Sequence, residues 1–117
     1  MYEVVFYERA NGEAPVQDFL DSLPVKLREK TLRSLTLLQE LGPQLRGEET
    51  EHVRDGLFEL RTKFGSDITR VFYFFFVRRT IVVTGGFIKK SQRTPRREIE
   101  RALRCKRDWE ETHHEDA

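Results

Sequence analysis

The alternation of hydrophobic and polar positions along the chain predicts four strands and three helices. Two segments have the features of helices. Residues 14–23 have Pro15 in the first turn, and residues 24–42 carry leucines at three- and four-residue steps between Pro24 and Gly42. Runs rich in β-branched and aromatic residues predict the strands, which are residues 2–8, 57–64, 67–77 and 80–89.

A final helix is expected to start at Thr94 and Pro95, with Thr94 as the N-cap, and to run to about Trp109. Residues 43–56 are polar and are expected to form a connector. The element order is therefore β-α-α-β-β-β-α. This order predicts one α+β domain, residues 1–109, in which a small antiparallel sheet has two N-terminal helices on one face and a C-terminal helix. Residues 110–117 are expected to form a flexible tail.

Two short turns set the expected register of the sheet. If Gly65-Ser66 is a two-residue hairpin turn, Arg61 lies directly opposite Arg70 on the same face. If Arg78-Arg79 is the next two-residue turn, Phe87 lies on the other side of Arg70, and Lys89 shares this face. A one-residue slip would reverse the second assignment, because strand side chains alternate sides.

This register also divides the apolar residues of the strands between two faces. One face is the expected floor for the two leucine-rich helices and carries Phe58, Leu60, Phe64, Val71, Tyr73, Phe75, Val82 and Ile88. The face with the two arginines has an apolar far end, which the last helix is expected to cover. That end is formed by Phe72, Phe74, Phe76, Ile81 and Val83.

Two like charges opposite each other on neighbouring strands are unfavourable unless something offsets them. One explanation is a nearby carboxylate, for which Glu59 and Asp67 are available. The other is a phosphate site, because a guanidinium donates two parallel hydrogen bonds to phosphate oxygens and keeps its charge. Both explanations stay open at the level of the sequence.

Charge is distributed unevenly along this chain of 117 residues, whose formal net charge is only +1. Residues 87–107 contain nine Lys or Arg and two Glu, and acidic residues dominate both ends. Such a basic segment is either a solvated surface or a surface that holds a polyanion. A single cysteine, Cys105, excludes a disulfide framework within the chain. The sequence shows no signal peptide and no long apolar run, so we expect a cytoplasmic protein without a membrane span.

Four segments, in this order and at these spacings, carry a resemblance to a known family. They are "GLFELR", "DITRVFYFF", "GGFIKK" and "TPRREIERA". The chain resembles the RelE/ParE-like toxins of type II toxin–antitoxin systems, and most of all the phage-type HigB branch. The resemblance implies a translation-inhibiting endoribonuclease that cuts mRNA, commonly on the ribosome. It also implies a HigA-like antitoxin partner with a helix-turn-helix domain, in a complex that is a higher oligomer.

The resemblance assigns a basic catalytic site to Arg61, Arg70, Lys89 and Lys90, with Arg93 beside it. Lys89 or Lys90 is the candidate general base, and Glu59 is the alternative. Three helix arginines are either a solvated face or an RNA-binding track with Arg93, and they are Arg97, Arg101 and Arg104. No cofactor is needed and no ligand set for a metal is identified.

No general acid is assigned, which is the main departure from the RelE branch. Tyr73 points to the core in the expected register, and His113 and His114 lie beyond the last helix. Two other functions therefore stay open. One is a non-catalytic, ParE-like inhibitor of DNA gyrase, and the other is a simple nucleic-acid-binding module.

Overall fold

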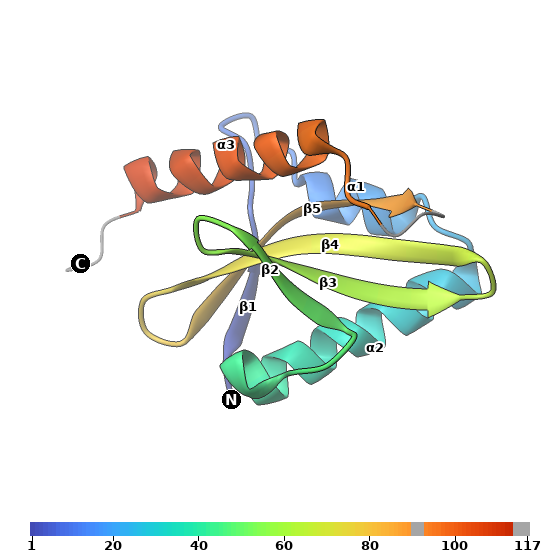
Figure 1. Ribbon diagram of the computed structural model, residues 1–117. Coiled ribbons are helices and arrows are strands. Elements are labelled where there is room, and N and C mark those ends of the chain that lie inside the picture. The colour runs from blue at the N-terminus through green and yellow to red at the C-terminus, as the bar shows by residue number, and fades with distance from the viewer. Residues whose placement is uncertain (90–92, 114–117) are drawn as a thin grey trace.

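A five-stranded sheet with helices on both faces forms the protein (Figure 1). The structure is a computed structural model that describes residues 1–89 and 93–113. The strands are β1 Glu3–Phe6, β2 Thr50–Arg54, β3 Leu57–Phe64, β4 Asp67–Phe76 and β5 Thr80–Lys89. The helices are α1 Pro15–Asp21, α2 Val25–Leu41 and α3 Arg96–Thr112, with a 3₁₀ turn at Gly42–Gln44. The predicted α+β class is confirmed.

The sheet is mixed, whereas an antiparallel sheet was predicted. Its strand order is β1-β5-β4-β3-β2, and β1 runs parallel to its neighbour β5. The other pairs are antiparallel. Parallel neighbours need a long crossover connection. Here the crossover consists of all the elements between β1 and β5. The residue pattern within β1 does not indicate whether this strand runs parallel or antiparallel to its neighbour.

Strand β2 lies in the segment that was predicted to be a connector. Asp55 and Gly56, which have φ angles of 53° and 80°, form the two-residue turn that leads from β2 into β3. Asp-Gly is one of the strongest hairpin signals, because both residues tolerate positive φ. The polar composition of β2 hides the strand, since three of its five residues are exposed at the edge of the sheet.

Helices α1 and α2 cover one face of the sheet and form the larger core with it (Figure 1). The predicted leucine-rich stripe of α2 is confirmed, since Leu27, Thr31, Leu35 and Leu38 are all buried. The buried Thr31 hydroxyl donates to the Leu27 carbonyl or shares a hydrogen bond with Thr69, so its polarity is compensated. Two residues that were predicted to form the sheet surface beneath these helices, Phe64 and Ile88, are exposed and lie outside the core.

The connection from β4 to β5 differs from the prediction in two ways that cancel. The turn has three residues, 77–79, because Phe76 pairs with Thr80. A register shift at Phe72 and Tyr73, where Thr84 is the extra residue on β5, then restores the expected pairing of Arg70 with Phe87.

The faces predicted for three residues of β5 are therefore wrong. Ile81 and Val83 lie in the core under α1 and α2, and Val82 lies on the α3 side. These residues precede the bulge, so the three-residue turn alone sets their faces. The residues beyond Thr84 lie on the faces that the sequence predicted.

Helix α3 covers the opposite face of the sheet (Figure 1), where Ala102, Leu103, Cys105 and Trp109 are buried. Thr94 is not the N-cap, because Pro95 holds that position and no side chain caps the helix. The helix continues to Thr112, three residues beyond its expected end. Residues 114–117 of the predicted tail lie outside the described residues, and the domain boundary stays a prediction.

Candidate functional site

Charged residues form ordered rows across the α3 side of the sheet. In one row Glu51, Glu59 and Phe72 are neighbours on β2, β3 and β4. The next row places Arg61 opposite Arg70, with Phe87 beyond it, as predicted from the sequence. A third row contains Lys63, Ile68 and Lys89. We call these three rows the charged face.

Each like-charge opposition is compensated by a diagonal neighbour. The Arg70 guanidinium donates to Glu59, with 2.7 Å between Nη1 and Oε2. The Arg61 guanidinium pairs with Glu51, with 3.0 Å between Nη2 and Oε1. Diagonal side chains on adjacent strands are within reach of long side chains. The carboxylate explanation offered for the arginine pair therefore holds for Arg70, with Glu59 as its partner.

Glu59 and Arg70 are buried, with 2% and 0% of their surface exposed. The second oxygen of Glu59 accepts the Thr94 hydroxyl at 2.5 Å, and Arg70 Nη1 lies 3.4 Å from the same hydroxyl. Thr94 lies two residues before the first residue of α3, so this buried cluster ties the start of the helix to the middle of the sheet. As a candidate base, Glu59 has both oxygens already engaged.

Arg61 is more accessible than Arg70. Its side chain is 19% exposed, and its partner Glu51 is 58% exposed. The Arg61 Nε is buried and has no hydrogen-bond partner among the residues that the structure describes. This Arg61 donor is therefore left unsatisfied by the described part of the chain.

Two lysines add charge at the end of the charged face where β3 meets β4. Lys89 is half-buried on β5, and Lys63 is exposed on β3. Neither lysine forms an ion pair with any residue in the ranges 1–89 and 93–113. Lys63 was missed from the sequence, although it lies two residues after Arg61 and strand side chains repeat with that period.

Arg93 is exposed and lines a surface cavity of about 400 Å³ beside the buried cluster. The other residues that line it are Glu51, Val53, Glu59, Thr94 and Ile99. Lys90, the second predicted catalytic lysine, lies outside the described residues. The structure thus brings Arg61, Arg70, Glu59, Lys89 and Arg93 to one side of the sheet, near the start of α3.

The three helix arginines lie apart from this cavity. Arg97 and Arg104 are exposed, and Arg97 Nε is 4.0 Å from Glu98. Arg101 Nη1 lies 3.4 Å from the same carboxylate, and Arg101 lines a different cavity. Sequence spacing predicted their common stripe on α3, but it did not predict their separation from the charged face.

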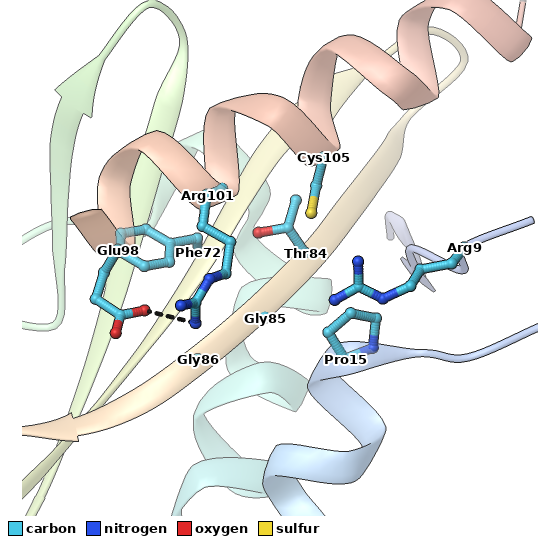
Figure 2. Close-up of a pocket in the computed structure, with 10 residues that line it drawn as sticks. Arg9, Pro15, Phe72, Thr84, Gly85, Gly86, Glu98, Arg101 and Cys105 are labelled. Atoms are coloured by element: carbon cyan, nitrogen blue, oxygen red, sulfur yellow. Dashed lines mark hydrogen bonds and ion pairs between the residues drawn. The ribbon is translucent and has the colours of Figure 1, made fainter. Parts of the chain in front are cut away.

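The cavity that Arg101 lines lies between α3, β5 and the segment that joins β1 to α1 (Figure 2). Its volume is about 200 Å³, and its floor includes Gly85 and Gly86 of β5. Arg9 and Arg101 extend into it from opposite sides, with Thr84 and Cys105 between them. Burial raises the pKa of the Cys105 thiol, which keeps that side chain neutral.

No helix within the described parts of the chain is long and apolar enough to cross a membrane. Across residues 1–89 and 93–113 there is no group of three or more His, Cys, Asp or Glu side chains that could hold a metal ion. Tyr73 is buried in the core, as expected, and its hydroxyl is hydrogen-bonded to Thr50. His113 stacks on Trp109 at the end of α3, away from the charged face.

The chain matches a known protein family. The sequence model of the family described as "Phage derived protein Gp49-like (DUF891)" matches residues 18–107. The matched range begins in α1 and includes β2 to β5 and most of α3, so it contains the whole charged face. No curated protein matches the chain.

Proposed function

Because the chain belongs to the Gp49-like family, a phage-derived family within the RelE/HigB-like toxin group, we propose that it is a toxin that cleaves mRNA. The observation that carries this proposal is the excess of cations on the charged face. Two acids there compensate two arginines, and Lys63 and Lys89 remain for a polyanion beside Arg61. An RNA backbone supplies the complementary negative charge.

Arg61 is the residue best placed to bind the reacting phosphate. Its present partner, Glu51, is 58% exposed, so an RNA phosphate can displace this carboxylate from the Arg61 guanidinium. The guanidinium then donates paired hydrogen bonds to two phosphate oxygens, which stabilises the charge that develops on them during cleavage.

RNA carries its own nucleophile, and the enzyme only has to position and deprotonate it. The 2′-oxygen attacks the adjacent phosphorus as the bond from phosphorus to the 5′-oxygen breaks, and the products are a 2′,3′-cyclic phosphate and a 5′-hydroxyl. Lys89 or Lys90, as the neutral amine, takes the proton from the 2′-hydroxyl and becomes the ammonium cation. The 5′-oxygen also needs a proton. No residue is assigned as the general acid, and a water molecule can donate this proton.

We propose that the buried ion pair of Arg70 and Glu59 stabilises the charged face and does not contact RNA. The sequence suggested that Arg70 contacts phosphate, but a substrate cannot reach a fully buried guanidinium without displacing the helix start above it. Their pairing instead orders β3 and β4 and fixes Thr94. In this proposal Arg61 and Lys89 contact RNA, while Arg70 is a positioning residue.

The proposed partner is a helix-turn-helix antitoxin encoded next to the toxin, which follows from the family relationship. The proposed site of action is mRNA on the ribosome. Expression in cells tests the partner and the site of action. The chain alone should arrest translation, and co-expression of the neighbouring reading frame should restore growth.

The test compares wild-type protein with the variants Arg61→Ala and Lys89→Ala. Induction of the wild type should stop growth and produce mRNA fragments with 2′,3′-cyclic phosphate ends, whereas both variants should do neither. Lys26→Ala is the matched control, because Lys26 is exposed on α2 at the opposite face of the sheet. Circular dichroism and soluble yield should be equal for all four proteins.

Two results would count against the proposal. If wild type arrests growth while mRNA stays intact and DNA becomes gyrase-damaged, the protein is an inhibitor of the ParE type. If both variants cleave mRNA as well as wild type does, the catalytic residues lie elsewhere.

A further inference from the structure

The cavity between α3 and β5 contains a polar group without a protein partner. Thr84 is 1% exposed, and its hydroxyl has no hydrogen-bond partner within the described residues. A buried hydroxyl left unpaired costs free energy, so such groups are rare and usually meet a water or a ligand. Thr84 is the extra residue of the β5 bulge, and bulges commonly re-aim a side chain beside a functional site.

Two guanidiniums reach the same cavity from separate elements (Figure 2). Arg101 extends from α3 and is held by Glu98 at 3.4 Å, while Arg9 extends from the segment after β1. The segment that carries Arg9 is ordered locally, because Asn11 accepts a hydrogen bond from the Glu13 backbone amide, and Arg9 Nε lies 3.8 Å from Glu13. The backbone that carries each arginine is therefore ordered, while the Arg9 and Arg101 side chains are 48% and 60% exposed and accessible to a ligand.

We propose that this cavity binds one phosphate group, whose oxygens accept hydrogen bonds from the Arg9 and Arg101 guanidiniums and from the Thr84 hydroxyl. Three donors that converge from different directions suit a tetrahedral oxyanion better than a planar carboxylate. Glu13 and Glu98 each lie beside one of the two arginines, but the Arg9 and Arg101 side chains are 48% and 60% exposed, so a phosphate can compete with both carboxylates. A volume of about 200 Å³ holds a phosphate and leaves space for the sugar or water attached to it.

The phosphate can come from an RNA strand or from a free nucleotide, and only the first source rests on the proposed function. Gly85 at the cavity and Lys89 on the charged face are four residues apart on β5, or about 13 Å. A strand that reaches both would therefore use two different phosphates. In that case the cavity would hold RNA at a distance from the bond that is cut.

The first experiment measures binding of inorganic phosphate and of a nucleoside 5′-monophosphate by calorimetry. Arg9→Ala and Arg101→Ala should each weaken binding by about tenfold or more, because each removes a charge-assisted hydrogen bond. Arg107→Ala is the matched control, since Arg107 is exposed on α3 and does not line the cavity. Glu98→Gln should tighten binding, because it removes the negative charge from the cavity.

Thr84→Val provides a test that separates a ligand contact from a structural role. Valine keeps the shape and removes the unpaired hydroxyl, so the free energy of unfolding should stay equal or rise. Phosphate affinity should nevertheless fall several-fold. If Thr84→Val lowers both the free energy of unfolding and the phosphate affinity, the loss of affinity comes from destabilisation. That result would contradict the role of Thr84 as a ligand contact.

A single-stranded 2′-deoxy oligonucleotide, which lacks the nucleophile and stays intact, distinguishes the two sources. If the strand is the ligand, Arg9→Ala and Arg101→Ala should each lower the slope of log affinity against log salt by about 0.7. Binding of the free phosphates alone would assign the cavity to a nucleotide. If neither probe responds to Arg9→Ala, Arg101→Ala and Thr84→Val, the proposal is wrong, whatever the outcome of the cleavage experiments.

Discussion

Glu59 and Arg70 form an ion pair from which water is excluded, with 2.7 Å between Oε2 and Nη1. They lie on adjacent strands, one row apart, and Thr94 closes the cluster from above. Desolvating two charges is costly, and their attraction offsets that cost only while both are present. Removal of Arg70 would relieve its repulsion from Arg61, but it would also leave the buried Glu59 carboxylate without its ion-pair partner.

We predict that Arg70→Ala lowers the free energy of unfolding by about 3–5 kcal/mol, because it leaves the Glu59 carboxylate buried without its guanidinium. Urea unfolding followed by circular dichroism measures this. The double variant Arg70→Met, Glu59→Leu should recover most of the loss, since an apolar pair of similar volume removes both desolvation costs. Equal stability of Arg70→Ala and wild type would show that the pair contributes nothing.

Thr94→Val should destabilise the start of α3. The Thr94 hydroxyl donates to Glu59, and a hydrogen bond to a charged group is worth about 1.5–3 kcal/mol. Amide hydrogen exchange should therefore accelerate in the first turns of α3 and remain unchanged at its end. Thr36→Val is the control, because that exposed hydroxyl bonds only to a carbonyl of its own helix, and its effect should be small.

The other end of α3 is held by Tyr7, whose hydroxyl donates to Asp108 at 2.6 Å. Burial, together with this hydrogen bond, raises the pKa of Tyr7 to about 12, from about 10 in the unfolded chain. The neutral phenol is thus favoured in the folded state. Its contribution to stability is fully present below pH 10 and is lost as the pH rises towards 12.

The stability difference between wild type and Tyr7→Phe should accordingly be constant from pH 7 to 9 and shrink between pH 10 and 12. Comparing the two proteins removes the contribution of other groups, such as Tyr73, whose pKa burial also raises. Cys105 and Arg9 affect the Tyr7 charge, so their substitution would shift this window. A difference that does not vary with pH would contradict the raised pKa.

Gly86→Ala should destabilise the sheet by about 1–3 kcal/mol through overpacking. A Cβ at this position would lie 2.8 Å from the Phe19 ring and 2.9 Å from the Arg70 carbonyl oxygen, and a backbone atom cannot easily move away. Gly85→Ala is the matched control, because its Cβ would meet only Pro15, at 3.6 Å. Thermal unfolding of the two variants should therefore differ, and identical melting temperatures would refute this account.

The sequence was most informative where local patterns decide the outcome. The Gly65-Ser66 turn determines which residues of β3 and β4 are opposed, and it correctly predicted Arg61 opposite Arg70. Strand β2 was missed because an exposed edge strand has little apolar signal, and the partner of Arg61, Glu51, was missed with it.

Other features depend on distant parts of the chain, which spacing does not reveal. That Arg70 is buried follows from α3 and Thr94 covering it, more than twenty residues later in the chain. The position of Phe87 was predicted correctly, although the turn and the bulge before it were not. The cavity between Arg9 and Arg101 joins both ends of the chain, so no local pattern indicates it.

The three-residue turn and the bulge at Thr84 divide β5 into two segments that can evolve separately. Residues 81–83 are constrained by the hydrophobic core, and residues 87–89 are constrained by the charged face. A deletion in the turn that is absorbed at the bulge would slide only the first segment, and loss of Thr84 would remove the bulge while both pairings beside it are kept. Selection for new chemistry can therefore act on one half of a strand while the other half keeps the domain folded.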